Sequence, residues 1–211
     1  MLKIAPEGWP FIYVAAGLTL IVYGIARPWM AIVPFILLLF MVFFFRDPDR
    51  VIPAGQGIYV SPADGKVIAI KKEFEGEYLR RESIRISIFM SPLNVHVNRA
   101  PCDGTVELVK HKDGRFKAAF TDEASLVNEN TAMALKRGGN MILVKQIAGV
   151  LARRVVCRVK AGDTLKRGER YGIVKFGSRV DIHLPADVSV IVKEGQKVRA
   201  GETVIARGGI S

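Results

Sequence analysis

Three residues in this sequence have the types that nucleophilic catalysis requires. They are Ser178 in KFGSRVD, His96 in SPLNVHVNRAP and Asp64 in SPADGKV. A serine hydroxyl needs a base to take its proton, and the base needs a carboxylate to orient it. Each residue also has a structural interpretation. Gly-Ser and Asp-Gly pairs are common in turns, and a histidine in an alternating strand can simply be half-buried.

The other two histidines are weaker candidates for an acid or a base. His111 lies in a polar HKDGR turn, where we expect it to be solvated. His183 lies five residues after Ser178, and an odd step along an alternating strand places two side chains on opposite faces. His96 follows directly after a Pro-Leu-Asn turn, so it is either a half-buried strand residue or a positioned acid or base that titrates near neutral pH. The sequence contains no metal-ligand cluster and no glycine-rich dinucleotide loop, so we expect no metal.

The N-terminal segment is expected to form a membrane-associated helical hairpin over residues 1–45. Uncharged runs of 18 and 17 residues, 9–26 and 29–45, are separated by Arg27-Pro28. At about 1.5 Å per residue each run makes a helix of roughly 26 Å, just short of a hydrocarbon core. The hairpin is expected to span the bilayer or to dip into it. The alternative is a buried hairpin in a soluble protein.

The charge of the chain is concentrated outside this segment. Residues 1–45 hold Lys3, Glu7 and Arg27, which sum to +1, so the remainder carries +10 of the total of +11. Such a basic domain could bind an anionic membrane surface or nucleic acid, and the apolar N-terminal segment favours the membrane. Arg46 and Arg50 follow the hairpin, which predicts an inner-membrane protein whose second domain faces the cytoplasm.

Residues 46–211 are expected to form a mostly β domain. Short stretches rich in β-branched residues alternate with Gly, Asp or Pro, and one short helical turn is expected over 123–126. The expected strands are 57–60, 66–70, 84–90, 105–110, 141–146, 154–159, 171–175, 180–184, 188–192 and 203–206. The two cysteines, Cys102 and Cys157, are expected to be free thiols because they are too few for a disulfide framework.

A weak internal repeat suggests the architecture of this domain. VKAGDTLKRGE at 159–169 and VKEGQKVRAGE at 192–202 share the frame V-K-x-G-x-x-x-x-x-G-E, and each precedes a short apolar strand. Short strands between glycine turns are the parts of a sandwiched barrel such as biotinyl and lipoyl domains use. We therefore expect a barrel-sandwich-like β domain.

Five motifs in order resemble the short form of phosphatidylserine decarboxylase over nearly the whole chain. They are SPADGKV, MSPLNVHVNRAP, NENTAM, QIAGVLARR and FGSRVD. The resemblance implies that the chain cuts itself between Gly177 and Ser178, giving a β chain of residues 1–177 and an α chain of residues 178–211. Ser178 would become a pyruvoyl cofactor that decarboxylates phosphatidylserine to phosphatidylethanolamine without a metal. Asp64, His96 and Ser178 would be the catalytic residues.

One departure from the family pattern affects the assignment of the base. Long-form members have two histidines three residues apart, and the second position here is Arg99. The resemblance therefore leaves open whether His96 serves self-cleavage, decarboxylation or both. Arg99, Arg179 and Asn128 are candidates to bind the head group of phosphatidylserine or another anionic membrane lipid. Homo-oligomerisation is left open, and no nucleic-acid partner is expected.

Two other functions fit parts of the sequence. A membrane-anchored carrier or adaptor with a biotinyl-like or lipoyl-like domain would explain the repeat, but FGSRVDIHLP stands where the modified lysine would be. A membrane-bound serine hydrolase would use Ser178, but the sequence lacks the G-x-S-x-G elbow. Intact mass separates these alternatives from the decarboxylase, because a single chain contradicts self-cleavage.

Overall fold

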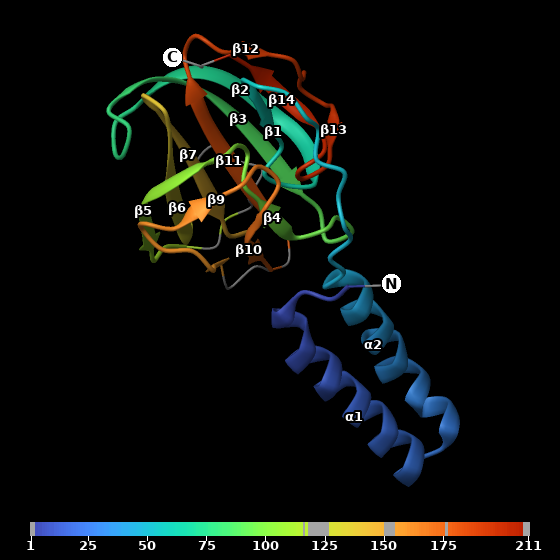
Figure 1. Cartoon of the computed structure of the whole chain (residues 1–211). Helices are drawn as coiled ribbons and strands as arrows, with labels where there is room; N and C mark the ends of the chain where they lie inside the picture. The colour runs from blue at the N-terminus through green and yellow to red at the C-terminus, as the bar shows by residue number, and fades with distance from the viewer. Residues whose placement is uncertain (1–2, 116, 118–126, 150–154, 176, 209–211) are drawn as a thin grey trace. The chain divides into compact units, whose positions relative to one another are not determined.

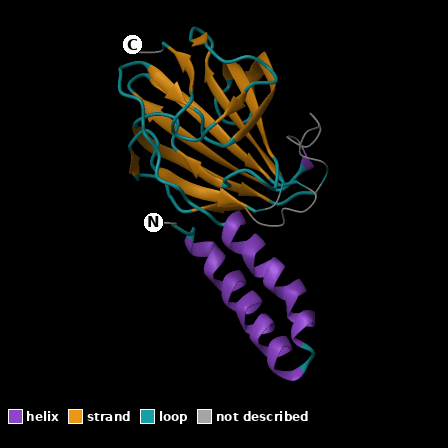
Figure 2. Cartoon of the chain, turned by 90° about the vertical axis from the view of Figure 1, so that its right-hand side faces the viewer, coloured by secondary structure: helices purple, strands orange, loops and turns teal. Residues whose placement is uncertain are grey.

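The computed structural model describes residues 3–115, 117, 127–149, 155–175 and 177–208. The chain divides into two compact units, residues 1–49 and residues 50–211 (Figure 1). The first unit contains the helices and the second contains the strands (Figure 2).

The N-terminal unit is a pair of apolar helices. α1 covers Trp9–Ile25 and α2 covers Ile32–Phe44, with short 3-10 helices before each, η1 at Pro6–Gly8 and η2 at Pro28–Ala31. The first helix ends before Arg27-Pro28 because a residue that precedes proline is disfavoured in the α region. Phe11 stacks on Phe45 with ring centroids 5.3 Å apart, which joins the start of α1 to the end of α2. The helix pair predicted from the sequence is confirmed.

The outward surface of this pair is apolar as well. Val14 and Leu20 each remain 71% exposed within the chain, and many other large apolar side chains of α1 and α2 are also exposed. Among the described residues, one helical stretch, Pro6–Ile25, is long and apolar enough to cross a membrane, and Pro28–Phe44 is shorter. Exposed apolar area of this extent is unfavourable in water and favourable in hydrocarbon.

The second unit is built on an antiparallel eight-stranded sheet in the order β13-β2-β3-β11-β7-β6-β5-β9, which curls into a half-barrel (Figure 1). Its strands are β2 Gly65–Glu75, β3 Arg81–Met90, β5 Gly104–Lys112, β6 Asn130–Arg137, β7 Asn140–Ile147, β9 Thr164–Leu165, β11 Ser178–Pro185 and β13 Lys197–Val198. Two three-stranded sheets accompany it. They are β1 Ile58–Val60 with β14 Val204–Arg207 and β12 Ser189–Val190, and β4 Val97–Arg99 with β10 Arg170–Val174 and β8 Val155–Cys157.

The two faces of the large sheet differ sharply in chemistry. Ile86, Val144 and Ile182 point into the main hydrophobic core. The alternate residues Asp181 and His183 lie on the other face and are also buried. Because side chains alternate along a strand, β11 carries one apolar and one polar face, whereas on β6 and β7 the second face holds a small apolar cluster of Ala132, Ala134 and Leu143. Strand β11 lies in the middle of this arrangement and is buried along its whole length.

The mostly β class is confirmed, and each of the ten expected strands has a counterpart. Four strands were not expected: β4, β6, β9 and β13. The sequence of β6, NTAMALKR, contains good helix formers, but pairing with β5 and β7 on either side makes it a strand. The helical turn expected over 123–126 lies outside the described residues.

The internal repeat forms the two edges of the large sheet. In one copy the backbone N–H of Glu169 donates to the carbonyl of Lys166 at 3.0 Å, and in the other Glu202 donates to Arg199 at 3.2 Å. Each copy contains a two-residue strand between its turns, β9 in the first and β13 in the second. These two strands occupy opposite ends of the strand order, so similar sequences end the sheet on both sides.

Candidate active site

Ser178 is the first residue of β11 and is fully buried. It pairs across the ladder with Met90, the last residue of β3, and its hydroxyl donates to the Met90 sulfur at 3.5 Å. Gly177, just before it, has φ = +59°, in the left-handed region that side chains of L-residues avoid. A Cβ built at Gly177 would have no neighbouring atom within 4 Å. Backbone conformation therefore favours glycine here, whereas space alone does not require it.

The turn before His96 orients its imidazole. Asn94 closes the turn, because its side-chain oxygen accepts hydrogen bonds from the N–H and the hydroxyl of Ser91, both at 2.9 Å. Nδ1 of His96 lies 2.9 Å from the carbonyl oxygen of Asn94. A carbonyl can only accept, so Nδ1 carries the proton and Nε2 of the neutral ring is the basic nitrogen. His96 is fully buried in this orientation.

Strands β4 and β10 bring the histidine segment to the serine segment. The carbonyl of His96 accepts a hydrogen bond from the N–H of Val174 at 3.3 Å, and Val174 precedes Ser178 by four residues. Two residues after His96, the amide nitrogen of Asn98 donates to the Met90 sulfur at 3.8 Å. That sulfur is also the acceptor for Ser178. The two segments therefore meet at Met90.

Asp64 is held by two donors that sequence reasoning did not identify. The Arg50 guanidinium contacts both carboxylate oxygens, at 2.8 and 3.1 Å, and the N–H of Ala200 donates at 2.7 Å. Arg50 also lies 3.4 Å from Glu202. Its side chain is only 7% exposed, so this is a largely buried ion pair. The carboxylate is thus fixed in place by the residue that begins the second unit.

Asp64 and Ser178 lie toward the same end of the sheet on strands separated by β3. Lys66, Phe89 and Arg179 form one row across β2, β3 and β11. Asp64 lies two residues before Lys66, and Ser178 lies one residue before Arg179. Neighbouring strands are about 4.8 Å apart, so two strand spacings separate them by roughly 10 Å at the backbone. The end of β3, at Phe89 and Met90, lies between them.

Arg179 points away from Ser178, into the polar face of the sheet. Its guanidinium binds Asp181 through two hydrogen bonds of 2.6 and 2.8 Å and donates to the Ser87 hydroxyl at 3.0 Å. Arg85 donates to the same hydroxyl at 2.8 Å and lies 3.7 Å from Asp181. Arg179 is fully buried in this cluster, so a contact with a lipid head group would require the cluster to open.

Arg99 and Asn128, the other two head-group candidates, are engaged by the backbone. Arg99 donates to the carbonyl of Gly168 at 2.9 Å. Asn128 donates to the carbonyls of Lys117 and Ala148, both at 2.7 Å, and accepts from the N–H of Lys117 at 2.8 Å. These contacts give both side chains a role in fastening loops to the sheet.

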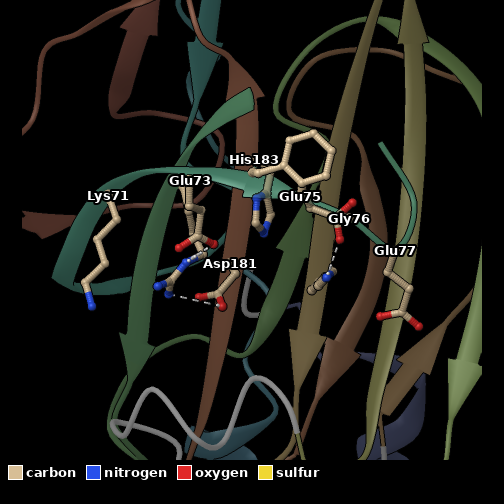
Figure 3. A pocket seen from close by; sticks show the side chains of 10 residues that line it. Lys71, Glu73, Glu75, Gly76, Glu77, Asp181 and His183 are labelled. Atoms are coloured by element: carbon tan, nitrogen blue, oxygen red, sulfur yellow. Dashed lines mark hydrogen bonds and ion pairs between the residues drawn. The ribbon is translucent and has the colours of Figure 1, made fainter. Parts of the chain in front are cut away.

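His183 lies on the face opposite Ser178, as strand alternation predicts, and lines a pocket of about 480 Å³ with Glu73, Glu75 and Asp181 (Figure 3). Its Nδ1 lies 3.1 Å from the Ser83 hydroxyl. Burial, together with the nearby Lys145 ammonium, lowers the pKa of His183 to about 4. His183 is therefore neutral near pH 7. The remaining histidine, His111, has a side chain 48% exposed.

Sequence reasoning missed Met90, Asn98, Gln146 and Arg50. Gln146 donates to the side-chain oxygen of Asn98 at 2.8 Å, and both residues are buried. The available signal was Gln146, an amide on the same face of an expected strand as the apolar Ile142 and Val144, whereas Asn98, Met90 and Arg50 had no comparable signal. A buried amide needs a partner, so a polar partner for Gln146 could have been expected, but not which residue it would be.

Comparisons with known proteins agree on one family. A sequence model described as Phosphatidylserine decarboxylase matches residues 37–206. A protein from Cupriavidus taiwanensis named phosphatidylserine decarboxylase proenzyme is 43% identical over 205 residues, which is 96% of this chain and 94% of that protein. Proteins of the same name are 45% identical in Syntrophus aciditrophicus, covering 95% of both chains, and 46% identical in Aromatoleum aromaticum, covering 96% of this chain and 94% of that one.

Proposed function

The chain belongs to the phosphatidylserine decarboxylase family, and we propose that it generates the pyruvoyl group for this reaction from its own Ser178. It is an enzyme that decarboxylates phosphatidylserine, as the relatives that match almost its whole length are named for doing. The carrier and hydrolase alternatives have no comparable support.

The proposed maturation is a cut of the chain by its own serine. The Ser178 hydroxyl attacks the carbonyl carbon of Gly177, and the bond from that carbon to the Ser178 nitrogen breaks, leaving an ester. Loss of the Cα proton expels the Gly177 carboxylate and leaves dehydroalanine at position 178. Water then replaces the nitrogen, which departs as ammonia. The products are the β chain 1–177, ending in a carboxylate, and the α chain 178–211, beginning with pyruvoyl.

The residues around Ser178 fit this chemistry. The glycine before the attacked bond has no side chain to shield its carbonyl, and its left-handed backbone is uncommon for other residues. Ser178 is buried, which shields the ester from bulk solvent. Nε2 of His96 is the basic nitrogen in a neighbouring segment. Asp64, fixed by Arg50, is the proposed carboxylate of the set.

In the second reaction the pyruvoyl group, once formed, supplies an electron sink for the electrons that carbon dioxide leaves behind. The protein's own task is to return a proton to the substrate α-carbon. His96 is the proposed acid because its ring is oriented by Asn94 and an imidazole exchanges protons near neutral pH. No metal is assigned to either reaction.

The apolar helix pair is proposed to anchor the enzyme in the inner membrane, where its lipid substrate lies. The described helix Pro6–Ile25 has the length and composition for this. The strand unit would face the cytoplasm, since Arg46 and Arg50 follow the second helix. Basic residues near anionic lipid contribute about 1 kcal/mol each, which would hold the catalytic unit at the head-group plane.

The observation that carries the proposal is the position of Ser178, buried at the start of a strand behind a left-handed glycine. Intact mass of the purified protein should show two chains divided after Gly177, and the smaller should lack an α-amine. Ser178→Ala should stay whole. His96→Ala should block either the cut or the release of carbon dioxide, whereas His111→Ala is the matched control and should do neither. A whole wild-type chain that still decarboxylates would overturn the proposal.

A further inference from the structure

The sulfur of Met90 accepts hydrogen bonds from two buried side chains. The Ser178 hydroxyl lies at 3.5 Å and the Asn98 amide nitrogen at 3.8 Å. Both donors are fully buried. A thioether is a weak acceptor, so neither donor is strongly satisfied. The core therefore holds an amide N–H beside the residue that would become the reactive ketone, with a poor acceptor as its partner.

Gln146 fixes the direction in which Asn98 points. Its amide nitrogen donates to the side-chain oxygen of Asn98 at 2.8 Å, so the nitrogen of Asn98 must face the other way, toward Met90. The carbonyl oxygen of Gln146 is buried and has no hydrogen-bond partner among the described residues. Leaving a buried polar atom unsatisfied costs about 1–3 kcal/mol. A pair of buried amides kept at such a cost points to a role other than stability.

We propose that Asn98 donates a hydrogen bond to the ketone oxygen at position 178 after maturation. This inference rests on the proposed function. Maturation carries the hydroxyl oxygen away with the Gly177 carboxylate, turns Cβ into a methyl group and places a water-derived ketone oxygen on Cα of residue 178, so the contact of the hydroxyl with the Met90 sulfur is lost. Asn98 is the donor that shares this sulfur, and a carbonyl oxygen is a better acceptor than a thioether. Maturation would thus give the Asn98 amide a stronger hydrogen-bond acceptor, the ketone oxygen, in place of the Met90 sulfur.

The hydrogen bond would make the ketone a better electrophile. An N–H aimed at a carbonyl oxygen stabilises the negative charge that grows there when the substrate amine attacks the carbon. Removing one such donor from a buried site lowers rates by roughly 100-fold or more. Gln146 would act as a positioning residue, since it touches Asn98 and fixes the amide without meeting the ketone itself.

The test compares Asn98→Leu, Asn98→Asp and Gln146→Leu with Ser83→Ala. Leucine keeps the approximate shape of asparagine, and aspartate replaces the donor with a second acceptor. Ser83 is the matched control because it is equally buried but lies on the opposite face of the sheet, where it contacts His183. Three quantities are measured: the extent of chain division by mass, the stretching frequency of the ketone by vibrational spectroscopy, and the rate at which an amine is fixed to the α chain by borohydride.

We expect all four variants to divide normally. In the two Asn98 variants the ketone band should move to higher frequency and amine fixation should slow roughly 100-fold, more in Asn98→Asp. Gln146→Leu should show smaller changes in the same direction, and Ser83→Ala none. A wild-type band in both Asn98 variants would overturn the inference, and so would failure of both to divide, because Asn98 would then belong to maturation. An undivided wild type would instead overturn the proposed function.

Discussion

The Ser178 hydroxyl donates to the sulfur of Met90, its direct partner across the ladder of β11 and β3. A thioether holds a hydroxyl without taking its proton, so this contact orients the nucleophile but does not activate it. In the proposed self-cleavage, the hydroxyl would have to leave the sulfur before reaching the Gly177 carbonyl.

Met90→Leu tests this resting contact. Leucine has a similar volume, so the core should remain packed, but the hydroxyl loses its acceptor. We expect the uncut chain to be destabilised by about 1 kcal/mol, and self-cleavage to be roughly fivefold faster because the attack does not use the sulfur. Time courses of chain division, followed by mass, provide the measurement. Cleavage slower than wild type would mean that the sulfur assists the attack.

Gly177→Ala tests the left-handed backbone at the cut. The new methyl group meets no atom, so the strain of φ = +59° is the main cost, about 1–2 kcal/mol. Gly162→Ala is the matched control, since Gly162 also has a positive φ, +93°, with open space around its Cβ, and lies in a turn of the repeat. Both variants should lose similar stability in thermal unfolding. Only Gly177→Ala should cleave more slowly, because its methyl group shields the carbonyl that is attacked. We expect a rate roughly tenfold lower, which corresponds to about 1.4 kcal/mol in the barrier.

Arg50→Met tests the ion pair that fixes Asp64. Removing one partner of a largely buried pair leaves the other charge unmatched, so the second unit should lose roughly 3 kcal/mol of unfolding free energy. Arg50→Lys keeps the charge but loses the two-pronged contact, and should lose less. Both Arg50 variants are made in a chain that also carries Ser178→Ala, so that cleavage does not interfere, and their unfolding free energies are measured by denaturant titration. If the two variants and the chain that keeps Arg50 had equal unfolding free energies, the ion pair would contribute nothing to the stability of the fold.

His183 should make the protein less stable in weak acid. Its pKa is about 4 in the folded chain against 6.5 for the free side chain, so between these values the unfolded chain binds the extra proton. Stability contributed by the neutral ring is therefore complete above pH 6.5 and falls as the pH drops toward 4. The full loss is about 3 kcal/mol at 1.36 kcal/mol per pH unit.

His183→Gln should flatten this part of the stability profile, as measured by denaturant unfolding at a series of pH values. The carboxylates near the ring, Asp181, Glu73 and Glu75, are present in both proteins and contribute equally. His111→Gln is the control, because that ring is half exposed. An unchanged slope in His183→Gln would show that another group causes the loss.

The sequence predicted local features of this protein better than it predicted long-range contacts. The helix break at Arg27-Pro28 and the turn that holds His96 depend on neighbours along the chain, and both could be anticipated. The contact of Arg50 with Glu202 joins residues 152 positions apart and has no local signal. Arg179 could not be assigned correctly for a different reason. Its partner Asp181 lies only two residues away, but the sequence does not show that both side chains are buried and bind each other.

Strand β11 lies between β3 and β7, at the centre of the sheet order, and begins at the residue where the cut is proposed. The shorter product would therefore carry a central strand whose neighbours on both sides belong to the longer product. Severing the backbone there leaves the two pieces interleaved, so they cannot drift apart unless the whole sheet is dismantled. A denaturant, rather than dilution, would be needed to separate them, and each molecule could mature only once.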